Sequence, residues 1–258
     1  NHLFPANESG RIPIVGLLGT GDSSLAARLV ASMLQLHGWQ TALACRDGLF
    51  VGPRQLSTND ARRYDDGERM LINRTVQAAV LETTPRQILT EGLPYDRCQV
   101  GVVMAMPGAE GLHDLYITEA DQLPNIVRTQ VDVVLTGGVA VLNADAPEVA
   151  ELADYCDGEV IFYGLDPDNE ALTAHRARKG RAVIARDASI VLASGPDETP
   201  LINLSAPVFA PITNEPPADV RPHVLAAVAA AWSLGVSADL IRAALLRFGE
   251  AHHNLAVH

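Results

Sequence analysis

The fold of this chain is decided by Ile12-Pro13-Ile14-Val15-Gly16-Leu17-Leu18-Gly19-Thr20-Gly21-Asp22-Ser23-Ser24, in which an apolar strand runs into a glycine-bearing turn that opens a helix. Glycines let backbone N–H groups close on an oxyanion, and a helix N-terminus adds partial positive charge. The pattern is therefore typical of a loop that holds phosphate groups. It makes six residues candidates for nucleotide binding: Gly19, Thr20, Gly21, Asp22, Ser23 and Ser24.

This loop lacks the lysine that a nucleoside-triphosphate site requires. In the pattern G-x-x-x-x-G-K-[ST] the lysine neutralises the outer phosphates and the hydroxyl reaches Mg²⁺, whereas Asp22-Ser23-Ser24 keeps a hydroxyl and adds a carboxylate. Two other interpretations stay open. In the first, one of these side chains only caps the helix, at about 1 kcal/mol, and binds nothing. In the second, Gly19, Gly21 and Asp47 form an NAD-type dinucleotide site, with Ser24 at the third glycine of that fingerprint.

The composition predicts a globular chain that does not bind polyanions. With 258 residues, 48% of them hydrophobic, it can bury the core of one large domain or of a domain with an appendage. Its net charge of -12 argues against nucleic acid and anionic membranes as partners, because both need clustered Lys and Arg. Short mixed runs such as residues 62–66 are expected to be solvated surface. Widely spaced cysteines and apolar runs well below the roughly 20 residues of a membrane span predict a cytoplasmic protein.

Apolar runs alternate with helical patterns along residues 12–163, as in a parallel sheet covered by helices on both faces. Residues 181–186 and 189–193 then predict an antiparallel hairpin, with 201–204 as a third strand at an edge. Two helices follow, over 220–234 and 238–248. We therefore expect an α/β domain over residues 12–250, mostly parallel, with a small antiparallel β appendage at about 181–204. Residues 1–11 are expected to be an approach segment, and 251–258 a flexible tail.

Three strand ends carry further candidates. Glu82 follows an apolar strand, where parallel sheets place their ligands, and could hold Mg²⁺ against phosphate oxygens or be a solvated acid. Asn143-Ala144-Asp145 could meet an adenine or ribose edge, or form a helix N-cap. His113 and Asp114 could do acid-base work, although a lone loop histidine is more often merely exposed.

Several segments carry a resemblance to a known family. They are Leu3-Phe4-Pro5, the threonine-led strand and Asp-Gly turn over 41–52, Val80-Leu81-Glu82-Thr83, Tyr95-Asp96-Arg97-Cys98 and Ala140-Val141-Leu142-Asn143-Ala144-Asp145. Together with the glycine loop, they resemble the central ATPase domain of the Mur-type peptide ligases, and in particular the Mur-like half of the cyanophycin synthetases. The resemblance covers nearly the whole chain and implies a phosphate-loop fold with ATP and Mg²⁺ as cofactors.

The resemblance assigns roles residue by residue and marks departures. An active loop in that family reads GTNGKTT, so Ser23 stands in the place of the lysine and Ser24 in that of the metal-binding threonine. Glu82 matches the family's magnesium glutamate. Asn143 and Asp145 fall on its nucleotide-side motif, and His223 stands where an asparagine would contact the base. The chain stops where the family's third domain would begin.

Losing one preorganised charge donor in such a site costs on the order of 10²–10³ in rate. A carboxylate ~5 Å from phosphate charge adds roughly 3 kcal/mol of repulsion per charge pair at an effective dielectric near 20. Our leading hypothesis is therefore a degenerate Mur-ligase-like domain that has lost its chemistry and serves as a structural or interaction module. Such a domain could have lost ATP and Mg²⁺ together with the chemistry. Its expected partners are an upstream ATP-grasp domain or a second copy of the chain. The alternatives are an active ATP-dependent amide ligase in which Arg86 replaces the lysine as a catalytic cation, and the NAD-type module.

Overall fold

The computed structural model describes residues 11–19, 23–209 and 219–256, with side chains to Glu250 in the last of these ranges. Of the loop candidates, Thr20, Gly21 and Asp22 lie outside the described residues, as does all of the expected approach segment except Arg11. No helix in the described part of the chain is long and apolar enough to cross a bilayer.

One sheet organises the chain, in the strand order β11-β10-β9-β8-β7-β6-β1-β5-β2-β3-β4. The strands from β2 to β9 in this order are parallel, and an antiparallel pair continues the sheet at each edge. The parallel strands are β1 (Ile14–Leu18), β2 (Thr41–Cys45), β5 (Ala78–Thr83), β6 (Cys98–Val103), β7 (Val134–Asn143), β8 (Glu159–Gly164) and β9 (Arg181–Arg186). The edge strands are β3 (Gly48–Val51), β4 (Arg54–Ser57), β10 (Ser189–Ser194) and β11 (Asp197–Asn203).

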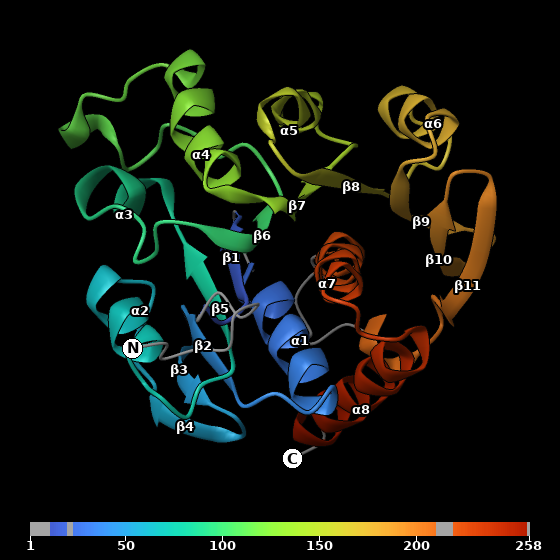
Figure 1. The fold of residues 1–258 in the computed structure, drawn as a ribbon, viewed down its shortest axis with the longest axis horizontal. Coiled ribbons are helices and arrows are strands. Elements are labelled where there is room, and N and C mark those ends of the chain that lie inside the picture. Colours follow the sequence, from blue (N-terminus) through green and yellow to red (C-terminus); the bar gives the residue numbers. More distant parts are fainter. Residues whose placement is uncertain (1–10, 20–22, 210–218, 257–258) are drawn as a thin grey trace, which may run out of the picture.

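Helices cover both faces of the sheet (Figure 1). One face carries α1 (Ser23–Leu36), α7 (Arg221–Ser233) and α8 (Ala238–Ala256). The other carries α2 (Tyr64–Leu71), α3 (Pro85–Thr90), α4 (Leu123–Asp132), α5 (Pro147–Ala150) with the 3₁₀ turn η3 (Glu151–Tyr155), and α6 (Glu170–Ala177). Shorter 3₁₀ turns are η1 (His113–Leu115), η2 (Ala120–Gln122) and η4 (Pro207–Phe209).

Strand alternation assigns each side chain to one of these faces. In β1, Val15 and Leu17 join the core under α1, whereas Leu18 joins the core on the opposite face. Helix α7 is apolar on all sides because it is buried on all sides: residues 224–231 are fully inaccessible, between the sheet and helices α1 and α8.

The predicted fold class is confirmed, and the structure adds three details. The hairpin of β9 and β10 forms as expected around Asp187 and Ala188, both in the left-handed region at φ 49° and 61°. It extends the main sheet, because β9 pairs in parallel with β8. The ribbon of β3 and β4 at the opposite edge was not predicted, because β4 is exposed and lacks an apolar run. The expected C-terminal tail belongs to α8 as far as Ala256.

Two glycines facing each other across β1 and β6 make room for a buried polar contact. Gly16 and Gly101 are register partners. A Cβ on Gly16 would collide with the Tyr95 hydroxyl, which donates to the Gln130 side-chain oxygen at 3.0 Å. A Cβ on Gly101 would lie 2.6 Å from the Gln130 carbonyl oxygen. The central strand that leads into the loop is therefore fixed by a close approach that only glycine allows.

We expect Gly16→Ala to lower the free energy of unfolding by about 1–3 kcal/mol, as overpacking of a dense core does, measured by urea denaturation. The matched control is Gly137→Ala, because a Cβ there meets nothing within 4 Å. In a Tyr95→Phe background, which removes the nearest colliding atom, the cost of Gly16→Ala should shrink. An equal cost in both backgrounds would contradict this account of the glycine.

Candidate functional site

A buried carboxylate at the C-terminal end of β5 is the centre of the candidate site. Glu82 is level with Leu17 of β1 and faces the α1 side together with Ala78 and Val80. Only 3% of Glu82 is exposed. Open parallel sheets bind ligands at this edge, at the point where the connections that follow two adjacent strands run to opposite sides of the sheet.

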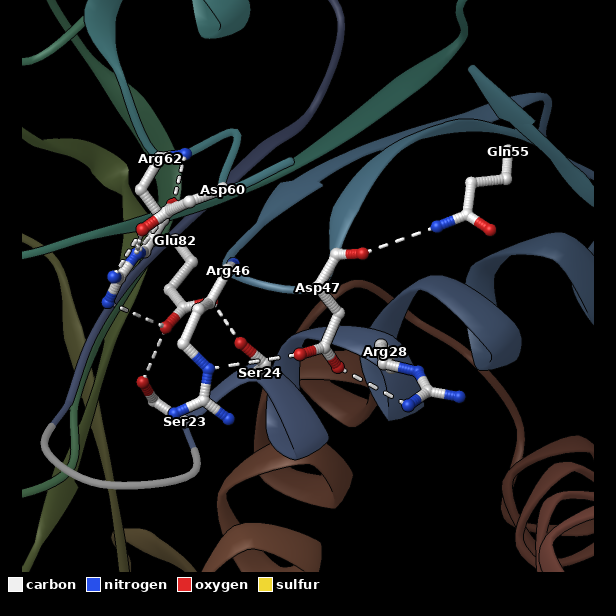
Figure 2. Close-up of polar contacts among 9 residues, drawn as sticks. All are labelled: Ser23, Ser24, Arg28, Arg46, Asp47, Gln55, Asp60, Arg62 and Glu82. Atoms are coloured by element: carbon white, nitrogen blue, oxygen red, sulfur yellow. Dashed lines mark hydrogen bonds and ion pairs between the residues drawn. The ribbon is translucent and has the colours of Figure 1, made fainter. Parts of the chain in front are cut away.

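Four groups from three segments converge on this carboxylate (Figure 2). The Ser23 hydroxyl donates to Oε1 at 2.7 Å, and the Ser24 hydroxyl donates to Oε2 at 2.6 Å. The backbone N–H of Arg46, just beyond β2, donates to Oε2 at 3.0 Å. The Arg62 guanidinium lies 3.8 Å from Oε1. The serines belong to the first turn of α1, whose partial positive charge also favours the carboxylate.

Arg62 is the cation that the sequence analysis missed. It was assigned to solvated surface, yet its side chain is 21% exposed and forms a two-pronged ion pair with Asp60, at 2.5 Å from Nη2 and 2.9 Å from Nε. The hydrogen bonds from Arg62 lower the pKa of Asp60 below its usual value. No motif marks this contact, because Arg62 and Glu82 meet only through the fold.

A second ion-pair group adjoins the first. The Asp47 carboxylate lies 3.3 Å from the Arg28 guanidinium and 3.8 Å from Nε of Arg46. In the NAD-type interpretation this carboxylate would meet a ribose. Here it is bound to arginines of α1 and of its own turn, which is a structural use of the residue.

The serines at the start of α1 do not act as helix caps in this structure, because their hydroxyls bind Glu82 rather than backbone N–H groups. Both are buried, Ser23 at 2% and Ser24 at 0% exposure. Gly19 approaches them closely, since a Cβ on Gly19 would lie 2.7 Å from the Cβ of Ser23.

Arg86, the candidate replacement for the lysine, is directed to another loop. A capping box between Thr84 and Gln87 begins α3, and Arg86 pairs with the Asp114 carboxylate and donates to the Gly111 carbonyl oxygen. These hydrogen bonds lower the pKa of Asp114. His113 begins the exposed turn η1 in the same loop. The structure therefore does not bring Arg86 together with the serines and Glu82.

The base-side candidates have structural partners of their own. The Asn143 amide donates to the Met104 carbonyl oxygen at 3.0 Å, and its oxygen accepts from the Asp145 N–H. The Asp145 carboxylate accepts from the Leu165 N–H at 2.6 Å and thus connects β7 to the segment after β8. His223 lies half-buried in the first turn of α7.

The described residues supply oxygen ligands of the kind that a Mg²⁺ site needs, but not the lysine that the family uses to bind phosphate. The Ser24 hydroxyl and the Glu82 carboxylate are adjacent oxygen donors of the kind that Mg²⁺ prefers. Within the described ranges, no group of three or more His, Cys, Asp or Glu side chains could hold a metal by itself. At the lysine position, Ser23 offers a neutral hydroxyl.

Comparison with known proteins finds relatives of this chain, although no family model matches it. The sequence is 31% identical over 248 residues to the cyanophycin synthetase of Crocosphaera subtropica, and 30% identical over 252 residues to that of Synechocystis sp.; each match covers 95% of this chain and 28% of the relative. It is 29% identical over 203 residues to the UDP-N-acetylmuramoyl-L-alanyl-D-glutamate--2,6-diaminopimelate ligase of Chlorobaculum tepidum, which covers 76% of this chain and 38% of that protein.

Solved structures agree on the fold. A UDP-N-acetylmuramoyl-L-alanyl-D-glutamate--2,6-diaminopimelate ligase superposes with a TM-score of 0.67 at 14% identity, covering 92% of this chain and 46% of the other. MurF from Acinetobacter baumannii superposes with a TM-score of 0.59 at 14% identity, with the same coverage. The chain is thus a Mur-ligase-like α/β domain. It is related to cyanophycin synthetase, and it spans 28% of the length of the first two relatives named above.

We expect Glu82→Gln to lower the free energy of unfolding by about 1–3 kcal/mol, because an amide N–H would face groups that themselves donate. Urea denaturation measures this, with Ser205→Ala, at an exposed serine, as the near-neutral control. Combining Glu82→Gln with Ser23→Ala should cost less than the sum of the two changes. Strict additivity would contradict the hydrogen bond as the source of the effect.

Proposed function

We propose that this domain keeps the Mur fold without the ligase chemistry and acts as a structural or interaction module. The observation that carries the proposal is Ser23. It stands at the lysine position of the family's loop, and its hydroxyl is used as a donor to the buried Glu82 carboxylate. Phosphoryl transfer depends almost wholly on positioning and on neutralising charge, so a neutral residue there affects the mechanism itself.

The chain has no second lysine with which to repair the loop. Its single lysine, Lys179, follows α6 and precedes β9. Strands β8, β7 and β6 separate β9 from β1. At the usual strand spacing, Lys179 therefore lies about 19 Å from β1 along the sheet.

Two candidate arginines, Arg62 and Arg86, are engaged in ways that oppose a catalytic role. Arg62 is held by Asp60 and lies beside Glu82, so its charge is already shared between two carboxylates. Arg86, required by the active-ligase alternative, binds Asp114 and Gly111. Asp22 adds a further negative charge to the loop sequence. The expected partner of such a module remains an upstream ATP-grasp domain or a second copy of the chain.

We expect calorimetry of the chain with Mg-ATP to give no binding in the micromolar range and no release of phosphate. The physical reason is the missing cation together with the added carboxylate, a change worth several kcal/mol of unfavourable interaction with a triphosphate. Micromolar binding accompanied by turnover would overturn the proposal.

A variant with the family's loop provides the matched control. Gly21→Asn, Asp22→Gly, Ser23→Lys and Ser24→Thr together give GTNGKT, the first six residues of the family's loop, and this variant should bind Mg-ATP at least about tenfold more tightly than the natural chain, the effect of one recovered charge-assisted contact. Arg86→Ala in the natural chain should leave nucleotide binding unchanged. Equal affinity of the natural and restored loops would contradict the role assigned to position 23.

A further inference from the structure

The face of the sheet opposite the Glu82 site carries an unfilled groove. It lies between α5 with η3 on one side and α6 on the other, above β8, and its volume is about 730 Å³. Figure 1 shows these two helices as neighbours along that face. The volume lies within the roughly 300–1,000 Å³ of ligand clefts.

Small side chains leave this space open. The walls carry four alanines: Ala150, Ala153, Ala171 and Ala174. The floor is formed by Val160 and Phe162 of β8. Helices that cover one face of a sheet normally meet through larger side chains, so alanine at these positions keeps an apolar trough open to solvent.

The rim of the groove is acidic, and its carboxylates have no partners among the residues that the structure describes. Glu151 and Asp154 lie on η3, and Glu170 begins α6; all three are exposed. None of the three forms a hydrogen bond or ion pair through its side chain with a described residue. Arg178, after the C-terminal end of α6, is the one cationic side chain on this rim.

The remaining titratable group in the wall does not offset the acidic rim. His175 packs edge-on against Phe162 with 5.0 Å between ring centroids, and its Nε2 lies 3.1 Å from the Arg181 carbonyl oxygen. Burial lowers the pKa of His175, so the ring is neutral at pH 7. The groove therefore combines an apolar floor with a net negative rim, on a chain whose net charge is -12.

From this combination we infer that the α5–α6 groove is a docking site for a basic amphipathic helix of a partner protein. Leu- and Ala-sized side chains on one face of such a helix fit a shallow apolar trough, and Lys or Arg on its flanks meet Glu151, Asp154 and Glu170. A small molecule would be left largely uncovered in a groove this open, whereas ligand clefts bury most of their ligand. The inference names the surface of the interaction module proposed above, and it does not depend on the state of the nucleotide loop.

The experiment uses a fluorescein-labelled peptide of about 18 residues, long enough to form a helix, with Leu and Ala on one face and Lys and Arg on the other. A second peptide has the same apolar face and Glu in place of every basic residue. Fluorescence anisotropy should show saturable binding of the basic peptide alone, weakened by added salt as expected for solvent-exposed ion pairs. Equal binding of both peptides, or binding of neither, would overturn the inference.

Two variants locate the binding. Ala174→Trp fills the trough from an exposed position and should weaken binding at least about tenfold by excluding the apolar face. Glu151→Lys with Glu170→Lys should weaken the basic peptide to a similar degree and favour the acidic one. Asp121→Lys, at an exposed carboxylate outside the groove, is the control.

Unchanged affinity in both groove variants would place the peptide elsewhere and refute the proposal. So would light scattering that showed a dimer of the chain broken by Ala174→Trp, because a second copy would then occupy the groove. A failure of these tests leaves the Mg-ATP measurement unaffected, so the two proposals can fail separately.

Discussion

The buried carboxylate of Glu82 is the constraint on which this end of the sheet depends. An ionised side chain out of contact with water must be surrounded by donors, or its desolvation destabilises the fold by several kcal/mol. Here the donors come from the first turn of α1, from the turn after β2 and from the segment before α2. One carboxylate thereby fixes how three segments, distant in sequence, meet beside the central strand.

On the proposed function, the same contact accounts for a fold that persists without the ligase chemistry. A lysine at position 23 would serve two anions, the glutamate and a phosphate. A serine hydroxyl serves the glutamate alone: it supplies one hydrogen bond and no charge, which is enough for a carboxylate already held by Ser24 and Arg46. A triphosphate carries several charges close together, so it needs cations rather than single neutral donors. On that proposal, this one position separates the stability of the domain from its affinity for nucleotide.

Much of the fold could be predicted because its determinants are local. Apolar runs of strand length mark the parallel strands, and the hairpin at Asp187 and Ala188 has a two-residue connection between two short apolar runs. The β3–β4 ribbon was not predicted, because β4 is exposed and forms a strand through its pairing with β3 rather than through its own apolar pattern. Tertiary pairing of that kind is invisible in a single sequence.

The same distinction between local and tertiary determinants applies to the candidate site. The proximity of Ser24 and Glu82 followed from the rule that parallel strands end at one edge, so both could be named in advance. Arg62 could not, because its approach to Glu82 depends on how residues 60–62 pass over the end of β5. Arg86 was named from its closeness in sequence to Glu82, but the capping box at Thr84 starts a helix there, and the guanidinium then reaches the loop at Gly111 and Asp114.

The sheet also keeps the two regions of interest mechanically separate. Glu82 points to the α1 face, whereas Phe162 belongs to the core on the α4–α6 face, with Ala150, Ala153 and Ala171 packed against it. Changes at sites that share no partners usually have additive effects, so the exchange of lysine for serine in the loop places no demand on α5 or α6. The proposed function uses this separation, because the domain would lose a ligand site at the end of its strands and still present a shaped, charged surface on the opposite face. Such a surface needs only the rigid scaffold that the parallel strands provide, and that scaffold is held by apolar packing and by the glycine pair at Gly16 and Gly101.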